Sequence, residues 1–340
     1  MEDKSRPVIA IDAMGGDFAP LEIIRGTLLA LESIDAEIVL FGNEKQINDI
    51  LDSELSSSSK LFLKNIKVIN STDDIKMDDS PSEVLKHRKN SSVFMGTEFA
   101  SKTKDCAFIS AGNTGAVMAC SLINMKKIEG ILRPAIATVI PLGEKKFVLL
   151  DSGANSEIKP LYFKQFAIMG TVYSREILKI KAPRTGLLNV GSEEKKGTEP
   201  VVEGYKLLKD SNLNFIGNVE GRDIFNGAAD VVVTDGFTGN ILLKAIEGMA
   251  NFFFAEIKNI FLNNFLTRIS ALMVKKELKS MKKRFDYEEY GGALLLGIDG
   301  ISIISHGSSS AKAVKNAIRV AADSLEAGIV NKIKNEVQNQ

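Results

Sequence analysis

Short apolar runs rich in β-branched residues alternate along the chain with segments whose apolar positions recur at three- and four-residue steps. Runs that are apolar throughout are typical of strands buried on both faces of a parallel sheet, and the periodic segments between them are typical of crossover helices. The pattern therefore predicts an α/β fold with a largely parallel sheet, which we assign to a single domain over residues 1–340. The clearest predicted strands are residues 8–12, 37–41, 106–110, 147–151, 185–190, 231–235 and 301–305.

The region from about residue 242 to residue 285 departs from this alternation. Apolar residues from Met249 to Leu272 recur at helical spacing, which predicts one apolar face of a helix. The stretch KKELKSMKKR follows, with six basic side chains and one acid, Glu277. We interpret residues 242–285 as two helices that form an arm inserted into the α/β domain.

Glycine-containing polar loops follow six of the predicted strands and precede helices. Glycine permits positive φ and close approach of a ligand, and a helix amino terminus presents unpaired N–H groups with a partial positive charge. Any one such loop is more simply explained as a tight turn. Six at one sheet edge predict a site for a phosphate-bearing ligand, because ligands bind outside the carboxyl ends of parallel strands. The loops are residues 12–17, 110–115, 151–155, 189–197, 235–240 and 305–310.

The candidate catalytic residues are Lys195, Asn240 and Asp235. The ammonium group of Lys195 could meet a phosphate or an oxyanion. Two interpretations stay open for Lys195 and its neighbour Lys196: anion contact, or a solvated charge pair offset by Glu193 and Glu194. Capping of helices is the default role of aspartate at such loop positions. The candidate substrate-binding residues are Asp12, Gly15, Gly16, Asp17, Lys89, Ser110, Gly112, Asn113, Thr114, Gly115, Asp151, Asn155, Asn189, Gly191, Lys196, Gly236, Thr238, Gly239, His306, Gly307 and Ser308.

Composition and charge narrow the classes of protein. Hydrophobic residues make up 44% and charged residues 25%, as in an ordinary globular protein. Lys plus Arg number 43 and Asp plus Glu number 43, so the chain lacks the positive field of a nucleic-acid binder. We expect no nucleic-acid partner. No apolar window approaches the length of a bilayer span, and we expect a cytoplasmic protein.

Scarce residue types and missing motifs limit the chemistry further. The only histidines are His87 and His306, which excludes a metal site made of several histidines, and we expect no metal. Cys106 and Cys120 have no partner cluster and suit small buried residues in a reducing compartment. The fingerprints G-x-G-x-x-G at the first helix and G-x-x-x-x-G-K-[ST] are missing, which disfavours a dehydrogenase or an ATPase. We expect no cofactor.

The chain resembles the phosphate acyltransferases of the PlsX type over roughly residues 8 to 325. These enzymes make acyl phosphate from acyl carrier protein thioesters and inorganic phosphate. The resemblance rests on IDAMGGDFAP, KHRKNSS, ISAGNTGAVM, RPAIA, LLDSGAN, GLLNVGSEEKKG, NFIGNVEGRDI, VVVTDGFTGN, YGGALLLG and SHGSSS.

The resemblance implies a Rossmann-like α/β/α sandwich related to isocitrate and isopropylmalate dehydrogenases, a homodimer, and the first step of bacterial phospholipid synthesis. A downstream acyl-phosphate:glycerol-3-phosphate acyltransferase would use the product. It also implies that the arm tip contacts an anionic membrane surface peripherally, or acidic acyl carrier protein. Dimer contact is an equally supported role for residues 252–261. The predicted contact residues at the tip are Ile269, Leu272, Met273, Lys275, Lys276 and Lys279.

The chain departs from the family pattern at one position. The family usually reads DAMGGDHAP, and Phe18 stands where that histidine is expected. An acid or base role for that ring is therefore lost or compensated, and His306 is the only loop histidine left to substitute. Three alternatives stay open: a phosphotransacetylase-like enzyme that uses coenzyme A thioesters, a nicotinamide-dependent decarboxylating dehydrogenase, and a membrane-recruited scaffold without activity.

Overall fold

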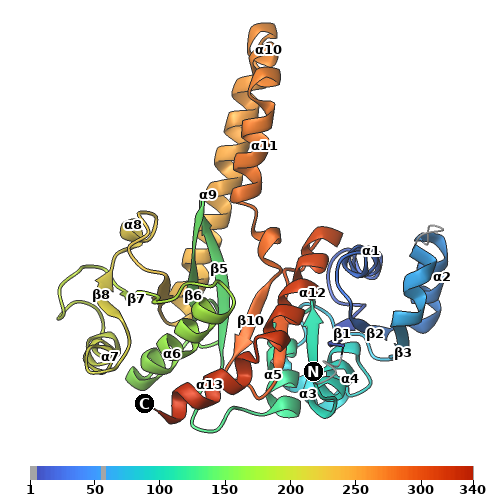
Figure 1. Ribbon diagram of the computed structural model, residues 1–340, viewed down its shortest axis with the longest axis horizontal. Helices are drawn as coiled ribbons and strands as arrows, with labels where there is room; N and C mark the ends of the chain where they lie inside the picture. The colour runs from blue at the N-terminus through green and yellow to red at the C-terminus, as the bar shows by residue number, and fades with distance from the viewer. Residues whose placement is uncertain (1–5, 55–58, 340) are drawn as a thin grey trace. The chain divides into compact units, whose positions relative to one another are not determined.

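The computed structural model describes residues 6–54 and 59–339, which form two compact units (Figure 1). Unit 1 takes in Met1–Ile136, Arg175–Lys179 and Glu288–Gln340, and unit 2 takes in Ala137–Ser174 and Ile180–Tyr287. Each unit has its own run of β-strands and its own helices. The interpretation of residues 1–340 as one domain stays a prediction.

The strands of unit 1 lie in the order β3-β2-β1-β4-β11-β10. Neighbours from β3 to β11 are parallel, and β10 runs antiparallel to β11. Ile11 pairs with Ile109, and Ile109 pairs with Ile303, so the carboxyl ends of β1, β4 and β11 lie at one edge. The strands are β1 (Val8–Asp12), β2 (Glu37–Gly42), β3 (Ile66–Asn70), β4 (Cys106–Ser110), β10 (Ala293–Leu296) and β11 (Ile301–Ile304).

Helices connect these strands, and close contacts between some of them depend on glycine. A Cβ atom on Gly26 of α1 would lie 2.5 Å from the Cβ of Val314 on α12, so only glycine permits these two helices to pack at this distance. The helices are α1 (Leu21–Leu31), α2 (Glu44–Glu54), α3 (Pro81–His87), α4 (Ser92–Lys102), α5 (Thr114–Met125), α12 (Ala311–Glu326) and α13 (Ile329–Gln338), with a 3-10 turn at Ser59–Asn65.

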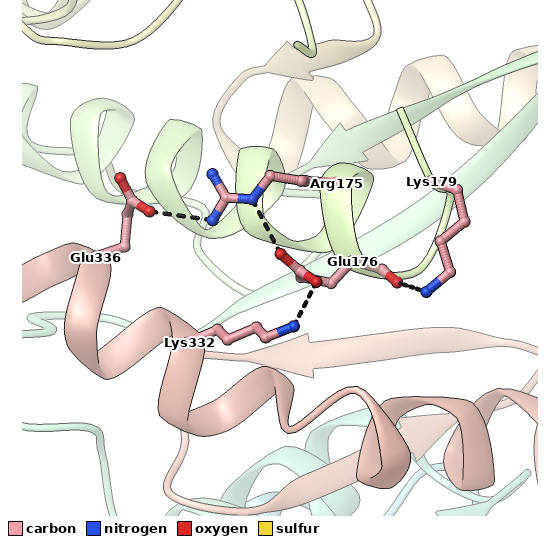
Figure 2. A network of polar contacts seen from close by, with 5 residues as sticks. All are labelled: Arg175, Glu176, Lys179, Lys332 and Glu336. Carbon is pink, nitrogen blue, oxygen red and sulfur yellow. Dashed lines mark hydrogen bonds and ion pairs between the residues drawn. The ribbon is translucent and has the colours of Figure 1, made fainter. Parts of the chain in front are cut away.

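A network of ion pairs fastens the C-terminal helix α13 to the end of α6 (Pro160–Glu176) within unit 1 (Figure 2). Arg175 donates to Glu176 at 3.0 Å and to Glu336 at 3.1 Å, and Lys332 donates to the other carboxylate oxygen of Glu176. Lys179 donates to the backbone carbonyl of Glu176 at 2.6 Å. The hydrogen bond from Lys332, followed by that from Arg175, holds the pKa of Glu176 below its usual value.

The strands of unit 2 lie in the order β5-β6-β9-β7-β8. β5 and β6 form an antiparallel hairpin, and β6, β9, β7 and β8 run parallel to one another. The loops that leave β6, β9, β7 and β8 therefore lie at one edge of this unit. The strands are β5 (Ala135–Leu142), β6 (Lys145–Leu150), β7 (Thr185–Leu188), β8 (Phe215–Val219) and β9 (Val231–Val233), and the helices other than α6 and the arm are α7 (Glu199–Lys209) and α8 (Gly221–Ile224).

The arm projects from unit 2 as a long helix, a short helix at the tip and a returning helix, drawn in orange in Figure 1. These are α9 (Gly236–Leu262), α10 (Phe265–Met273) and α11 (Lys275–Arg284). The pattern of residues 242–285 predicts two helices, and the structure has three over residues 236–284, because the side chain of Asn264 caps a new helix by accepting from the Thr267 amide at 3.0 Å. α9 also begins inside the predicted loop at residues 235–240.

The predicted α/β class with a mostly parallel sheet is confirmed, and each of the seven predicted runs contains a strand. The antiparallel pairs β5–β6 and β10–β11 make the sheet mixed. Among the described residues, no helix combines the length and apolarity needed to span a membrane.

Candidate functional site

Three of the predicted loops meet in unit 1, and a buried carboxylate joins two of them. Asp12 ends β1 and is 1% exposed. Its Oδ1 accepts from the amides of Met14 at 3.0 Å and Gly15 at 3.1 Å, and its Oδ2 accepts from the Ser110 hydroxyl at 2.7 Å. The Ser110 oxygen in turn accepts from the Gly112 amide at 3.0 Å. The loops at residues 12–17 and 110–115 are thus tied through one carboxylate.

Burial dominates the electrostatics of Asp12. Loss of hydration raises the pKa of its carboxyl group, and hydrogen bonds from Ser110, from Ser92 and from the backbone counteract part of that rise. Ser92 is not among the predicted site residues. A buried N-terminal residue of α4 carries no sequence signal that would associate it with a carboxylate 80 positions earlier.

Glycines let the three loops of unit 1 approach at backbone distance. A Cβ atom on Gly15 would lie 2.7 Å from the Gly112 nitrogen, and one on Gly16 would lie 3.0 Å from the Gly307 oxygen. Gly16 has a φ of +111°, which glycine adopts without strain. The amide of Asp17 donates to the Gly307 carbonyl at 2.7 Å, so the loop that carries Phe18 contacts the loop that carries His306.

The buried side chain of Asn113 binds the backbone of residues 76–79 rather than presenting its amide to solvent. Its Nδ2 donates to the carbonyls of Lys76 at 3.2 Å, Met77 at 2.9 Å and Asp79 at 2.9 Å. Its Oδ1 accepts from the Ala116 amide and caps α5. The donors near it that lack a described acceptor are the first-turn amides of Thr114 and Gly115.

Some of the hydrogen-bonding groups of the third loop of unit 1, residues 305–310, are already paired with other protein groups. His306 is exposed, and its Nδ1 lies 2.8 Å from the Ser308 hydroxyl and 3.2 Å from the Ser308 amide. The amide of Ala311, in the first turn of α12, donates to the carboxylate of Glu22 at 2.7 Å. The positive end of α12 therefore already meets a side-chain anion, which sequence reasoning missed because the two residues are 289 positions apart.

A second buried aspartate organises unit 2. Asp151 directly follows β6 and is 0% exposed. Its Oδ1 accepts from the amides of Gly153 at 3.1 Å and Ala154 at 3.0 Å. Its Oδ2 accepts from the Ala154 amide at 3.1 Å, the Asn155 amide at 2.7 Å and the Asn155 side chain at 2.9 Å.

The loop after β9 packs directly on the Asp151 loop. Gly236 donates its amide to the Asn155 carbonyl at 2.7 Å, and a Cβ atom on Gly239 would lie 1.9 Å from the Asp151 carbonyl oxygen. Asp235 caps α9, because its carboxylate accepts from the Thr238 amide at 2.8 Å and the Thr238 hydroxyl at 2.7 Å. The Asp235 carboxylate is therefore paired with the amide and the hydroxyl of Thr238.

Asn240 follows on the first turns of α9 and is exposed. A Cβ atom on Gly153 would lie 3.8 Å from the Asn240 Cγ, so the amide stands beside the Asp151 loop. The structure describes no hydrogen bond to this side chain from the residues it covers. Its amide group can donate to a negatively charged oxygen.

The third loop of unit 2 follows β7, the strand next to β9, and carries Lys195 and Lys196, both exposed. Glu194 accepts from Lys209 at 2.7 Å and from the Tyr205 hydroxyl at 3.2 Å. Among the residues that the structure describes, neither Lys195 nor Lys196 has an ion-pair partner. Glu194 is therefore engaged by Lys209 and Tyr205 rather than by either of these lysines, and anion contact by Lys195 and Lys196 stays a prediction.

Side chains shape the backbone of this third loop of unit 2. Asn189 donates from Nδ2 to the Lys196 carbonyl at 2.9 Å, and its Oδ1 accepts from the Val190 amide at 2.8 Å. A Cβ atom on Gly191 would lie 2.7 Å from the Glu193 Oε2 and 3.3 Å from the Lys196 Cγ. Asn189 therefore fixes the loop, and its side chain is already engaged by protein atoms.

The structure brings the predicted residues together in two groups, one in each unit. The loops at residues 12–17, 110–115 and 305–310 contact one another in unit 1, and those at residues 151–155 and 235–240 do so in unit 2. Lys89 lies exposed after α3. No group of three or more His, Cys, Asp and Glu side chains is placed to hold a metal ion within the described residues.

The predicted tip residues occupy α10 and the start of α11. Leu272 and Met273 are 71% and 79% exposed, and Ile269 is 44% exposed. Lys275 and Lys276 begin α11 and are exposed as well. The tip therefore places apolar side chains in solvent directly beside basic ones.

The two cysteines lie in regular secondary structure rather than in the predicted loops. Cys106 is in β4 and Cys120 is in α5, and both are buried. Burial raises the pKa of each thiol to about 12, so neither is a thiolate near neutral pH.

Comparison with known proteins shows where the chain belongs. A family model described as fatty acid synthesis protein matches residues 8–332. A phosphate acyltransferase of Pelotomaculum thermopropionicum is 46% identical over 331 residues, which cover 97% of this chain and 95% of the relative. A phosphate acyltransferase of Halothermothrix orenii is 46% identical over 332 residues, which cover 97% and 98%.

Solved structures share the fold at low sequence identity. A phosphotransacetylase of Streptococcus pyogenes superposes with a TM-score of 0.62 at 14% identity and covers 94% of both chains. A branched-chain phosphotransacylase of Enterococcus faecalis gives a TM-score of 0.57 at 13% identity and covers 94% of this chain and 99% of its own. The family model and the relatives span all six loops, and the chain therefore belongs to the fatty acid synthesis protein family, together with relatives named phosphate acyltransferase.

Proposed function

We propose that this protein transfers a fatty acyl group from acyl carrier protein to inorganic phosphate and so forms acyl phosphate for bacterial phospholipid synthesis. One observation carries the proposal: relatives that are 46% identical over 97% of the chain are named phosphate acyltransferase. The similarity extends through every loop that the structure gathers at the sheet edges of its two units.

The reaction needs no side-chain nucleophile, because phosphate itself attacks the thioester. A phosphate oxygen attacks the thioester carbonyl carbon, the carbonyl oxygen becomes an oxyanion, and the carbon–sulfur bond then breaks. The carrier leaves as a thiolate and takes up a proton. Phosphate is anionic near neutral pH, so positioning and oxyanion stabilisation dominate: proximity can contribute of order 7 to 11 kcal/mol, and one oxyanion donor about 3 kcal/mol.

Unit 2 supplies groups of the required kind. The Asn240 amide is exposed beside the Asp151 loop and can donate to the developing oxyanion. Lys195 and Lys196 are exposed on the loop after the neighbouring strand and can hold phosphate. Asp235 acts through its cap on α9, the helix that carries Asn240.

Unit 1 offers backbone donors instead of cations. The first-turn amides of Thr114 and Gly115 in α5 have no acceptor among the described residues. Unpaired amides at a helix amino terminus suit an anionic substrate group.

The arm is proposed to serve assembly and recruitment. Phe252 and Phe253 are 57% and 55% exposed on α9, as expected of a surface that a second copy of the chain would cover in a homodimer. The tip of exposed apolar and basic side chains would contact an anionic membrane surface or the acidic carrier. Acyl phosphate formed there would pass to an acyltransferase that uses glycerol 3-phosphate.

Phosphate-dependent release of free thiol from a long-chain acyl carrier protein tests the proposal. We expect thiol release that rises with phosphate concentration, with acyl phosphate appearing in equal amount. Acyl coenzyme A serves as the competing donor, because the fold is shared with phosphotransacetylases. If the protein turns over acyl coenzyme A but not acyl carrier protein, then coenzyme A is the thiol carrier. If the thioester stays intact in excess phosphate, the proposed acyltransferase function is refuted.

A further inference from the structure

The two buried aspartates at the candidate loops use the same hydrogen-bonding pattern. Asp12 and Asp151 both stand at the carboxyl end of a strand, and the Oδ1 of each accepts from the amides two and three residues later. In each case a glycine backbone closely approaches the carboxylate. A Cβ atom on Gly15 would lie 2.2 Å from the Asp12 Oδ2, and one on Gly236 would lie 2.7 Å from the Asp151 Oδ2.

Neither carboxylate is available to a substrate. Asp12 is 1% exposed and Asp151 is 0% exposed. The oxygens of Asp12 accept from two amides and the hydroxyls of Ser110 and Ser92, and those of Asp151 accept from three amides and the Asn155 side chain. A group that is fully engaged by protein donors can neither bind phosphate nor take a proton from it in this arrangement.

We propose that Asp12 and Asp151 are positioning residues that each hold the candidate substrate loops of their own unit in shape, rather than groups that touch the substrates. The expected changes in kinetics rest on the proposed function. The expected changes in loop structure rest on the hydrogen bonds alone. Asp151 fixes the loop against which Gly236 and Asn240 of α9 lie. Asp12 fixes the loop that contacts Gly112 and, through Asp17, Gly307.

The donors around the two carboxylates differ, and this difference predicts unequal responses to the isosteric change to asparagine. One donor at Asp12 is the hydroxyl of Ser110, which can reverse and accept from the side-chain amide of an asparagine introduced there. Apart from the Asn155 side chain, whose amide can flip, the donors described at Asp151 are backbone N–H groups, which cannot reverse. Whichever way an asparagine turns there, its NH₂ group faces at least two N–H groups.

The experiment compares Asp12→Asn and Asp151→Asn with Asp52→Asn, which makes the same change on the exposed face of α2. We expect Asp151→Asn to raise the phosphate KM about 10-fold or more and to lower kcat, and Asp12→Asn to lower kcat/KM by a smaller factor with the pH profile in place. Asp52→Asn should match the parent protein. Loss of turnover in folded Asp12→Asn, or a normal Asp151→Asn, would overturn the clamp assignment.

Amide hydrogen exchange gives a readout that does not require activity. In Asp151→Asn, exchange at residues 153–155 should accelerate about 10-fold or more relative to the parent protein, and exchange in the β6 core should not. Unchanged exchange at residues 153–155 would refute the clamp even if the protein were an acyltransferase. Faster exchange in a protein that never releases thiol would support the clamp and refute the proposed function.

Discussion

Ser110 donates its hydroxyl proton to Asp12 across 2.7 Å, although 98 positions separate the two residues in the sequence. The bond forms because β1 and β4 are parallel neighbours and end at the same edge. It meets one oxygen of a carboxylate that is buried and has a raised pKa. The Ser110 hydroxyl therefore both provides a hydrogen bond to the buried Asp12 carboxylate and joins two loops of unit 1.

Removing that hydroxyl should destabilise the protein. Ser110→Ala leaves the Asp12 Oδ2 and the Gly112 amide without this partner, and an unsatisfied buried group costs about 1–3 kcal/mol in the free energy of unfolding. Ser302→Ala is the matched control, because Ser302 is a buried serine of β11 that bonds to the neutral Ser121 hydroxyl. We expect a larger drop in urea midpoint for Ser110→Ala, and equal midpoints would contradict this account.

The ion pair between Lys332 and Glu176 should contribute stability that depends on pH. The pKa of Glu176 is lowered in the folded chain, so its contribution is present above the unfolded value of 4.5 and is lost as pH falls through the folded pKa. We expect Lys332→Gln to lower the free energy of unfolding by about 0.5–1 kcal/mol at pH 7 and by progressively less below pH 4.5.

Denaturant unfolding at several pH values measures this difference. Lys315→Gln on α12 is the control, since the described part of the chain offers Lys315 no ion-pair partner. A pH-independent difference between Lys332→Gln and the parent protein would show that the lysine stem, rather than the ion pair, holds α13 on α6.

Strong local signals explain why much of the fold was predictable. Residues 8–12 and 106–110 are short, largely apolar runs followed by glycine loops, and they form β1 and β4 as expected. β8 was missed because Gly217 and Asn218 interrupt its apolar pattern, and β10 has only four residues next to two glycines. Their strand conformation depends on pairing with β7 and β11, which no local pattern encodes.

The site was predictable to the level of loops but not of atoms. Sequence placed Asn113 and Asp151 beside a ligand, and the structure shows their polar atoms engaged by backbone groups. These partners depend on how distant segments pack, as when the carbonyl of Met77 meets Asn113 across 36 positions. Lys195 has no ion pair with Glu194 in part because Lys209 donates to that carboxylate. The sequence does not indicate this pairing.

The available lysines should matter for phosphate. Lys195→Gln with Lys196→Gln should raise the phosphate KM about 10-fold or more, because charge-assisted hydrogen bonds to an anion are lost. Asn240→Ala should instead lower kcat by about 100-fold through loss of an oxyanion donor. Lys206→Gln removes an exposed charge from α7, the helix that follows the loop of the two lysines, and should leave both constants unchanged. Parent-like kinetics in the double lysine variant would remove these lysines from the site.

The buried thiols should be inert. Cys106 and Cys120 have thiol pKa values of about 12, so almost no thiolate exists near neutral pH to react with an aromatic disulfide reagent. We expect no labelling of the native protein on the timescale of an assay, complete labelling in denaturant, and turnover that survives the reagent. Rapid loss of turnover with labelling of the native protein would show a reactive cysteine.

The arm tip should bind anionic vesicles through its apolar side chains. Leu272→Glu with Met273→Glu replaces two side chains that are 71% and 79% exposed, places negative charge beside Lys275 and Lys276, and should weaken sedimentation with phosphatidylglycerol vesicles about 10-fold or more. The change touches no described buried contact of unit 2, so thiol release in solution should persist.

A control for the vesicle experiment must replace an equally exposed leucine by glutamate at a position outside the arm. Leu61→Glu serves, because Leu61 of unit 1 is 71% exposed, as Leu272 is. The parent protein and Leu61→Glu should bind alike, and raising the salt concentration should weaken both, since screening reduces attraction between the basic helix α11 and anionic lipid. Equal binding by the doubly charged tip variant would assign vesicle contact to another surface and leave the tip to the carrier protein.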